Sequence, residues 1–121
     1  MIEGGYATIF VSDLDRAVRF YTDTLDLALQ FRAGDHWAEI DAGSGLVLGL
    51  HPAGEHNPPP GSHGAISVGL NVTQPLESVV ERLKEQGVQF RGSIVEDEGV
   101  RLAFFGDPDG NDLYLCEVRP P

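Results

Sequence analysis

The sequence predicts an α+β protein in which one β-α-β-β-β unit occurs twice. Residues 6–51 and residues 66–118 each contain an alternating apolar segment, then apolar residues at helical spacing, then three further strand-like segments. A segment rich in proline, glycine and histidine, residues 52–64, separates the two halves. Because one helix covers only one face of each sheet, we expect the two modules to form a curved mixed sheet around a cleft, with the helices on the outer face.

The first module, about residues 5–51, begins with a strand over Tyr6–Val11 that places Ala7, Ile9 and Val11 on one face. Ser12 and Asp15 resemble a capping box and predict a helix start. The helix carries apolar side chains at helical spacing, namely Leu14, Ala17, Val18, Tyr21 and Leu25. Three further strands are predicted at Leu29–Arg32, Trp37–Asp41 and Leu46–His51.

The second module, about residues 65–118, repeats this order. A strand over Ile66–Val72 precedes a helix that Thr73 and Pro75 open and Gly87 closes. The remaining strands are predicted at Val88–Arg91, Val100–Phe105 and Leu113–Val118. We interpret residues 1–121 as a single domain, and residues 52–64 as a connector or a lid over the cleft.

Side-chain alternation assigns residues to the two faces of each predicted strand. In the first module we expect the cleft side to carry Trp37, Glu39, Asp41, Val47, Gly49 and His51. In the last pair of strands we expect Leu102, Phe104, Leu113 and Leu115 to face the helix, and the cleft side to carry Arg101, Ala103, Phe105, Tyr114 and Cys116. A shift of one residue inverts such an assignment.

Composition narrows the classes of function. Nineteen acidic against eight basic side chains give a formal charge of −11, which repels nucleic-acid backbones and favours cationic ligands. We find no apolar run of the roughly 20 residues that a membrane span requires, and no secretory signal at the start. The lone cysteine, Cys116, excludes an intrachain disulfide, which is compatible with a reducing cytoplasm. From these three observations together we expect a cytoplasmic protein that binds neither nucleic acid nor membrane.

Two strings resemble a known family. Val11–Tyr21, followed by Leu25-Asp26-Leu27, resembles the opening of vicinal-oxygen-chelate proteins, and Phe105–Asn111 resembles their closing turn. At Asp26 the family usually has glycine, but aspartate tolerates the left-handed conformation. The resemblance covers nearly the whole chain and implies the glyoxalase/bleomycin-resistance fold, a small-molecule cleft and a homodimer. Members include metal-dependent enzymes and metal-free antibiotic-binding proteins, so the fold leaves the function open.

The resemblance also implies where a metal would bind. Catalytic members hold a divalent cation with histidine, glutamate or glutamine side chains on the central strands. Counted from the two strings, these positions are Tyr6, Gly49, Ser67 and Tyr114. Neutral hydroxyls are poor ligands and glycine has no side chain, so we expect this metal site to be lost and predict no cofactor.

Glu39 and His51 are the polar side chains with the strongest claim to chemistry. With a loop histidine, such as His36, His56 or His63, they would form a displaced divalent-metal site. Without metal they would serve as an acid–base pair, because histidine titrates near neutral pH. The alternative is a hydrogen-bonded Glu–His pair that only lines the pocket.

The remaining candidates are ligand-binding residues. Trp37 is either a stacking platform or a packing residue, and Tyr6, Phe105 and Tyr114 either form an aromatic wall or fill the cleft. Ser67 is expected to add a hydroxyl group to the ligand-binding lining. Arg101 is expected to pair with a ligand carboxylate or with Glu39. Our first hypothesis is a metal-independent protein that binds or sequesters a cationic or aromatic small molecule, such as an antibiotic or metabolite. The alternatives are a lyase, isomerase or dioxygenase acting through Glu39 and His51, and a non-catalytic dimerisation or interaction domain.

Overall fold

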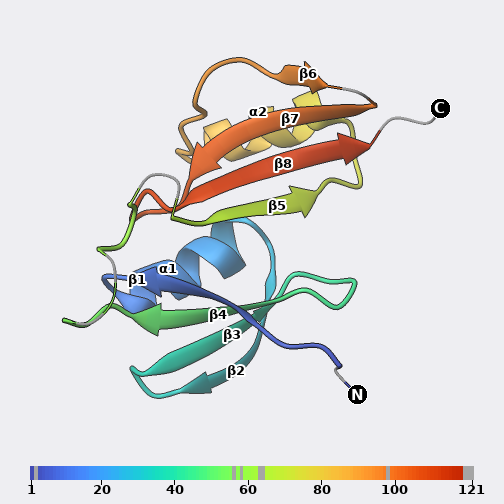
Figure 1. Ribbon diagram of the computed structural model, residues 1–121. Coiled ribbons are helices and arrows are strands. Elements are labelled where there is room, and N and C mark those ends of the chain that lie inside the picture. The colour runs from blue at the N-terminus through green and yellow to red at the C-terminus, as the bar shows by residue number, and fades with distance from the viewer. Residues whose placement is uncertain (2, 56, 58, 63–64, 98, 119–121) are drawn as a thin grey trace. The chain divides into compact units, whose positions relative to one another are not determined.

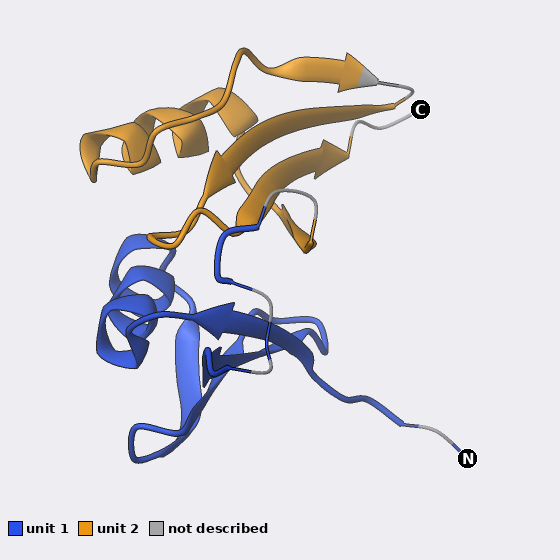
Figure 2. Ribbon diagram, turned by 60° about the vertical axis from the view of Figure 1, so that its left-hand side comes forward, with its two compact units in different colours: residues 1–62 blue, residues 63–121 orange. Residues whose placement is uncertain are grey.

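A computed structural model describes residues 1, 3–55, 57, 59–62, 65–97 and 99–118 (Figure 1). The chain divides into two compact units, residues 1–62 and residues 63–121 (Figure 2). Each unit contains one four-stranded mixed sheet and one α-helix that packs on it. The predicted connector at residues 52–64 includes positions 56, 58, 63 and 64, which lie outside the described residues.

The N-terminal unit has the strand order β1-β4-β3-β2. Its elements are β1 (Ala7–Val11), α1 (Leu14–Arg19), β2 (Ala28–Ala33), β3 (Trp37–Asp41) and β4 (Val47–Pro52). β1 is parallel to β4, and the other neighbours are antiparallel. The C-terminal unit repeats this order as β5-β8-β7-β6, with elements β5 (Ser67–Asn71), α2 (Leu76–Glu85), β6 (Val95–Asp97), β7 (Val100–Gly106) and β8 (Asp112–Val118). The repeated strand order confirms the predicted duplication and the α+β class.

The first helix begins one residue later than the predicted capping box implies. Asp13 is the N-cap, and its carboxylate accepts a hydrogen bond of 3.1 Å from the backbone N–H of Arg16. Ser12 instead accepts a hydrogen bond from the Arg16 side chain. After Arg19 the helix widens into a π-helical turn, Phe20–Thr24, and ends before Asp26, whose φ of +60° agrees with the expected left-handed residue.

One predicted strand is displaced. Residues 88–91 form no strand: Phe90 makes a single bridge to Phe105, and β6 occurs only at Val95–Asp97. Val88 is buried, and its backbone N–H closes the end of α2 by bonding to Leu83. Val88 therefore belongs to the end of α2, and the chain pairs with β7 as a strand only from Val95.

Each helix covers one face of its sheet, and we call the opposite face the open face. In the N-terminal unit the helix side is fully buried at Ile9, Ala38, Ile40, Leu48 and Leu50. The open face carries Thr8, Phe10, Phe31, Trp37, Glu39, Gly49 and His51. The alternation predicted for β1, β3 and β4 is therefore confirmed.

The predicted alternation of β7 is wrong. Ala103 pairs with Leu115 and Phe105 pairs with Leu113, and all four side chains are buried on the helix side. Leu102 and Phe104 therefore lie on the open face, opposite Cys116 and Tyr114. Arg101 and Phe105 therefore lie on the helix side and do not face a cleft. The prediction failed because β7 carries apolar side chains on both faces, and because Glu77 of α2 neutralises Arg101 on the helix side. The prediction for β8 itself was right.

The closing turn has a structural explanation. The Asp107 carboxylate accepts hydrogen bonds from the backbone N–H groups of Asp109 and Asn111 at 3.0 and 2.9 Å, and from the Asn111 side chain at 2.9 Å. Asp107 and Asn111 are both buried. This part of the family string therefore stabilises the β7–β8 connection.

Candidate functional site

The four positions that the resemblance assigns to metal ligands lie at matching places in the two sheets. Gly49 of β4 pairs with Thr8 of β1, and Tyr114 of β8 pairs with Gly69 of β5. Tyr6 directly precedes β1 and is 58% exposed, and Ser67 is the exposed first residue of β5. No carboxylate, imidazole or amide therefore occupies any of these four positions.

At Gly49 an aromatic ring fills the place of a side chain. A Cβ atom on Gly49 would lie 2.1 Å from Cη2 of Trp37 and 2.7 Å from its Cζ2. The indole thus rests directly on the glycine backbone, and Gly49 is buried although it faces the open side of the sheet. Any residue other than glycine, including a metal-ligating one, would displace Trp37.

The C-terminal unit uses the same arrangement with different residues. A Cβ atom on Gly69 would lie 2.4 Å from Cζ of Tyr114, so the phenol rests on Gly69 as the indole rests on Gly49. The Tyr114 ring centroid lies 5.7 Å from that of Phe104. Each open face therefore carries an aromatic ring in close contact with a glycine.

Glu39 is held as an anion beside Trp37. Its two carboxylate oxygens accept hydrogen bonds from Trp37 Nε1 at 2.8 Å and from Gln30 Nε2 at 3.0 Å. These bonds, first that of Trp37, then that of Gln30 and to a lesser degree that of Tyr6, lower the pKa of Glu39, and partial burial opposes them. Glu39 therefore keeps its negative charge at neutral pH.

His51 lies on the same face but does not pair with Glu39. Its Nδ1 lies 2.7 Å from the Pro52 carbonyl oxygen and donates to it. Its ring packs edge-on against Phe10 and Trp37, with centroids 5.7 and 6.3 Å apart. The hydrogen-bonded Glu39–His51 pair is thus not formed: His51 Nδ1 bonds to Pro52, and the Glu39 oxygens bond to Trp37 and Gln30.

These side chains form one surface, which we call the Trp37 surface: Tyr6, Phe10, Trp37, Glu39 and His51. The Tyr6 and Trp37 rings meet edge to face with centroids 5.8 Å apart. The surface combines aromatic rings with one oriented carboxylate, a set that suits stacking and cation binding. A metal ion would need more donors, and among the described residues no three histidine, cysteine, aspartate or glutamate side chains converge.

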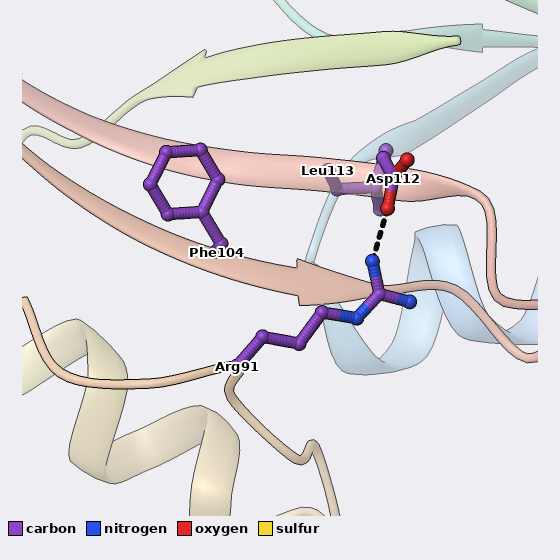
Figure 3. A pocket seen from close by; sticks show the side chains of 4 residues that line it. All are labelled: Arg91, Phe104, Asp112 and Leu113. Carbon is purple, nitrogen blue, oxygen red and sulfur yellow. Dashed lines mark hydrogen bonds and ion pairs between the residues drawn. The ribbon is translucent and has the colours of Figure 1, made fainter. Parts of the chain in front are cut away.

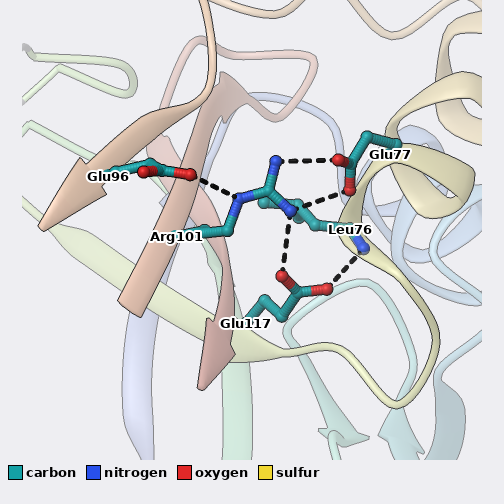
Figure 4. Close-up of polar contacts among 5 residues, drawn as sticks. All are labelled: Leu76, Glu77, Glu96, Arg101 and Glu117. Carbon is teal, nitrogen blue, oxygen red and sulfur yellow. Dashed lines mark hydrogen bonds and ion pairs between the residues drawn. The ribbon is translucent and has the colours of Figure 1, made fainter. Parts of the chain in front are cut away.

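Arg101 belongs to an ion-pair cluster on the helix side of the C-terminal sheet (Figure 4). Its guanidinium bonds to both oxygens of Glu77 at 2.8 and 2.9 Å and to Glu117 at 3.1 Å, and its Nε lies 3.4 Å from Glu96, an ion-pair distance without hydrogen-bond geometry. The other Glu117 oxygen accepts a hydrogen bond of 2.8 Å from the Leu76 N–H at the start of α2. Arg101 therefore joins α2 to β6, β7 and β8, and its partners are these glutamates rather than Glu39.

Sequence reasoning missed a hollow on the open face of the C-terminal unit. A cavity of about 380 Å³ lies beside Phe104 and the ion pair between Arg91 and Asp112 (Figure 3). The Arg91 guanidinium also donates to the Gly110 carbonyl oxygen and passes over Gly106. A side chain at position 106 would collide with the Arg91 guanidinium, so the glycine at this position is a sequence feature consistent with the contact.

The fold and the site define a duplicated α+β module with an aromatic open face. A profile of the Glyoxalase/Bleomycin resistance protein/Dioxygenase superfamily matches residues 5–115, and the chain belongs to this family. The chain is 30% identical over 103 residues to an uncharacterised protein of Mycolicibacterium smegmatis (strain ATCC 700084 / mc(2)155), covering 85% of this chain and 83% of that one.

Solved structures of the family resemble this chain closely. TnmS3, an antibiotic binding protein from Streptomyces sp. CB03234, superposes with a TM-score of 0.81 and 28% identity, covering 98% of this chain and 97% of that one. A superfamily member from Sphaerobacter thermophilus DSM 20745 gives a TM-score of 0.78 and 28% identity, with coverages of 97% and 98%.

Within the described residues, no helix is both long and apolar enough to cross a membrane.

Proposed function

We propose that this protein binds a small organic molecule without a metal ion, and that the Trp37 surface is its main contact. The placement of the indole on Gly49 carries the proposal, because it replaces a family ligand position with a stacking ring. Likeness to TnmS3, an antibiotic binding protein, supports the same class of function. An enzyme acting through Glu39 and His51 is less well supported, since the two side chains do not pair.

The ligand we propose is flat, aromatic and cationic. A flat ring can stack on the outer face of Trp37 or Tyr6, and a positive charge can pair with Glu39. The formal charge of −11 adds a field that attracts cations. A homodimer and a cytoplasmic location are parts of the same proposal and rest on the family resemblance and the composition.

Matched probes test the charge preference. By isothermal titration calorimetry, we expect proflavine, a cationic tricycle, to bind at least about tenfold more tightly than neutral acridone or an anionic anthraquinone sulfonate. Glu39→Gln should remove this preference, because glutamine keeps the shape of glutamate without its charge. Asp41→Asn is the control, since Asp41 lies on the same strand and bonds instead to the Gly43 N–H at 2.8 Å. Equal loss in both variants, or equal affinity for the three probes, would refute the proposed specificity.

The same preference should survive mild acidification. Hydrogen bonds from Trp37 and Gln30 stabilise the charged form of Glu39 and lower its pKa, so the carboxylate is protonated only below the ordinary glutamate range. We therefore expect the ratio of proflavine affinities between the wild-type protein and Glu39→Gln, which share the field of the other carboxylates, to stay constant as the pH falls through the ordinary glutamate pKa. The ratio should drop only when the lowered pKa of Glu39 is reached. In Gln30→Ala the drop should move to higher pH. A titration with identical midpoints in the two proteins would contradict this role of Gln30.

A further inference from the structure

A second cavity lies on the helix side of the C-terminal unit, away from its open face. Its volume is about 450 Å³, within the range of roughly 300–1,000 Å³ typical of small-molecule sites. It lies between α2, β7 and the segment that follows α2, and the residues that matter for its chemistry are Val80, Lys84, Phe90, Ser93, Ile94 and Ala103.

The hollow follows from the side chains on the helix side of β7. Arg101, Ala103 and Phe105 alternate there as large, small and large. At the edge of the sheet the chain bridges to β7 at Phe90 and pairs again only from Val95. The intervening segment therefore leaves the sheet beside Ala103, and the cavity lies there, with Val80 and Ile94 among its other lining residues.

The walls of this cavity combine four apolar side chains with polar groups and one cation. Val80 and Ala103 are buried, and Phe90 and Ile94 are half-buried. Lys84 follows Val80 by one helical turn, lines the cavity and is exposed, so its ammonium group stands where the cavity meets solvent. Lys84 is the only lysine of the chain, and among the described residues no carboxylate forms an ion pair with it.

We propose that this cavity binds a compact monocarboxylate with an apolar body, of the size of a medium-chain fatty acid. The hydrocarbon part would occupy the space over Ala103, and the carboxylate would pair with Lys84 and accept a hydrogen bond from the exposed Ser93 hydroxyl. The net charge of −11 opposes an anion at long range. At physiological salt this field is screened beyond about 8 Å, whereas the direct contact with Lys84 is not. The site is independent of the Trp37 surface.

The composition of the chain supplies a separate reporter for each site. Reductive methylation with ¹³C-formaldehyde labels one lysine side chain, Lys84, in addition to the α-amino group, and Trp37 is the only tryptophan. We expect octanoate to shift the Lys84 resonance saturably with one-to-one stoichiometry and to leave Trp37 fluorescence unchanged. Octylamine should not shift it. Octanoate that shifts no Lys84 resonance, or octylamine that binds equally well, would overturn the proposal.

Variants of the cavity complete the test by calorimetry on unmodified protein. Lys84→Met should weaken octanoate binding about tenfold and leave octanol binding unchanged, whereas Lys84→Arg should retain octanoate binding. Ala103→Leu should fill the cavity and abolish binding of both. Ser93→Leu, in an exposed segment, blocks the cavity from the other side and serves if Ala103→Leu does not fold. Wild-type octanoate affinity in Lys84→Met or in a folded blocking variant would refute the assignment.

Discussion

Replacing Gly49 by alanine should destabilise the protein by about 2 kcal/mol, because the added methyl group cannot coexist with the indole of Trp37. The Cβ atom would lie 2.1 Å from Cη2 of Trp37, well inside contact distance, so the ring must leave the sheet. Urea denaturation measures the loss, and a changed Trp37 emission maximum reports the displaced ring. Proflavine binding should fall with it, by at least about tenfold, since the stacking platform is lost.

The chain offers a matched glycine and a rescue. Gly54→Ala is the control, because a Cβ atom there meets only Asn57 Oδ1 at 3.6 Å, an ordinary contact. In Trp37→Ala the obstacle is absent, so adding Gly49→Ala should cost less than it does in the wild-type protein. Strictly additive effects of the two substitutions would show that the ring does not rest on Gly49.

The second large effect should follow from Arg101→Met. This change leaves Glu77, Glu96 and Glu117 facing one another without their common cation, and we expect the melting temperature to fall by roughly 5–10 °C. The Arg101 side chain is only 13% exposed, so solvent does not replace the lost partner well, although Glu77 and Glu96 themselves are mostly exposed.

Arg82→Met is the control for Arg101→Met. It removes the same charge from an exposed position of α2, and we expect almost no change in melting temperature. If both variants melt at the same temperature, the cluster around Arg101 contributes nothing specific to the stability of the C-terminal unit.

The fold was predictable where one sheet face is strongly apolar. In β4, Leu48 and Leu50 are buried and Gly49 lies between them, so the alternation had one solution. In β7 both faces carry apolar side chains, Leu102 and Phe104 on one, Ala103 and Phe105 on the other, and alternation could not choose. Arg101, a charged residue, favoured placing its face of β7 away from the helix. Its neutralising partner, Glu77, lies 24 residues earlier, so the pairing could not be recognised from local sequence.

The site was predictable in its members but not in its contacts. Trp37, Glu39 and His51 share a face because they alternate on adjacent strands, and the sequence predicts that much. That Trp37 lies on Gly49, twelve positions later, depends on strand register and rotamer. The hydrogen bond from Gln30 to Glu39 occurs beside a β-bulge in β2 between Leu29 and Phe31. The alternation of apolar residues in the sequence does not predict this bulge.

Metal dependence of binding tests the central claim most directly. Protein purified without a histidine tag should contain less than about a tenth of an equivalent of divalent metal, because Tyr6, Gly49, Ser67 and Tyr114 are poor metal ligands and no donor cluster occurs among the described residues. In calorimetry, its affinity for proflavine should be the same in EDTA as in added Zn²⁺, Mn²⁺ or Ni²⁺. Stoichiometric metal in the purified protein, or binding that EDTA abolishes and metal restores, would contradict a metal-independent site on the Trp37 surface.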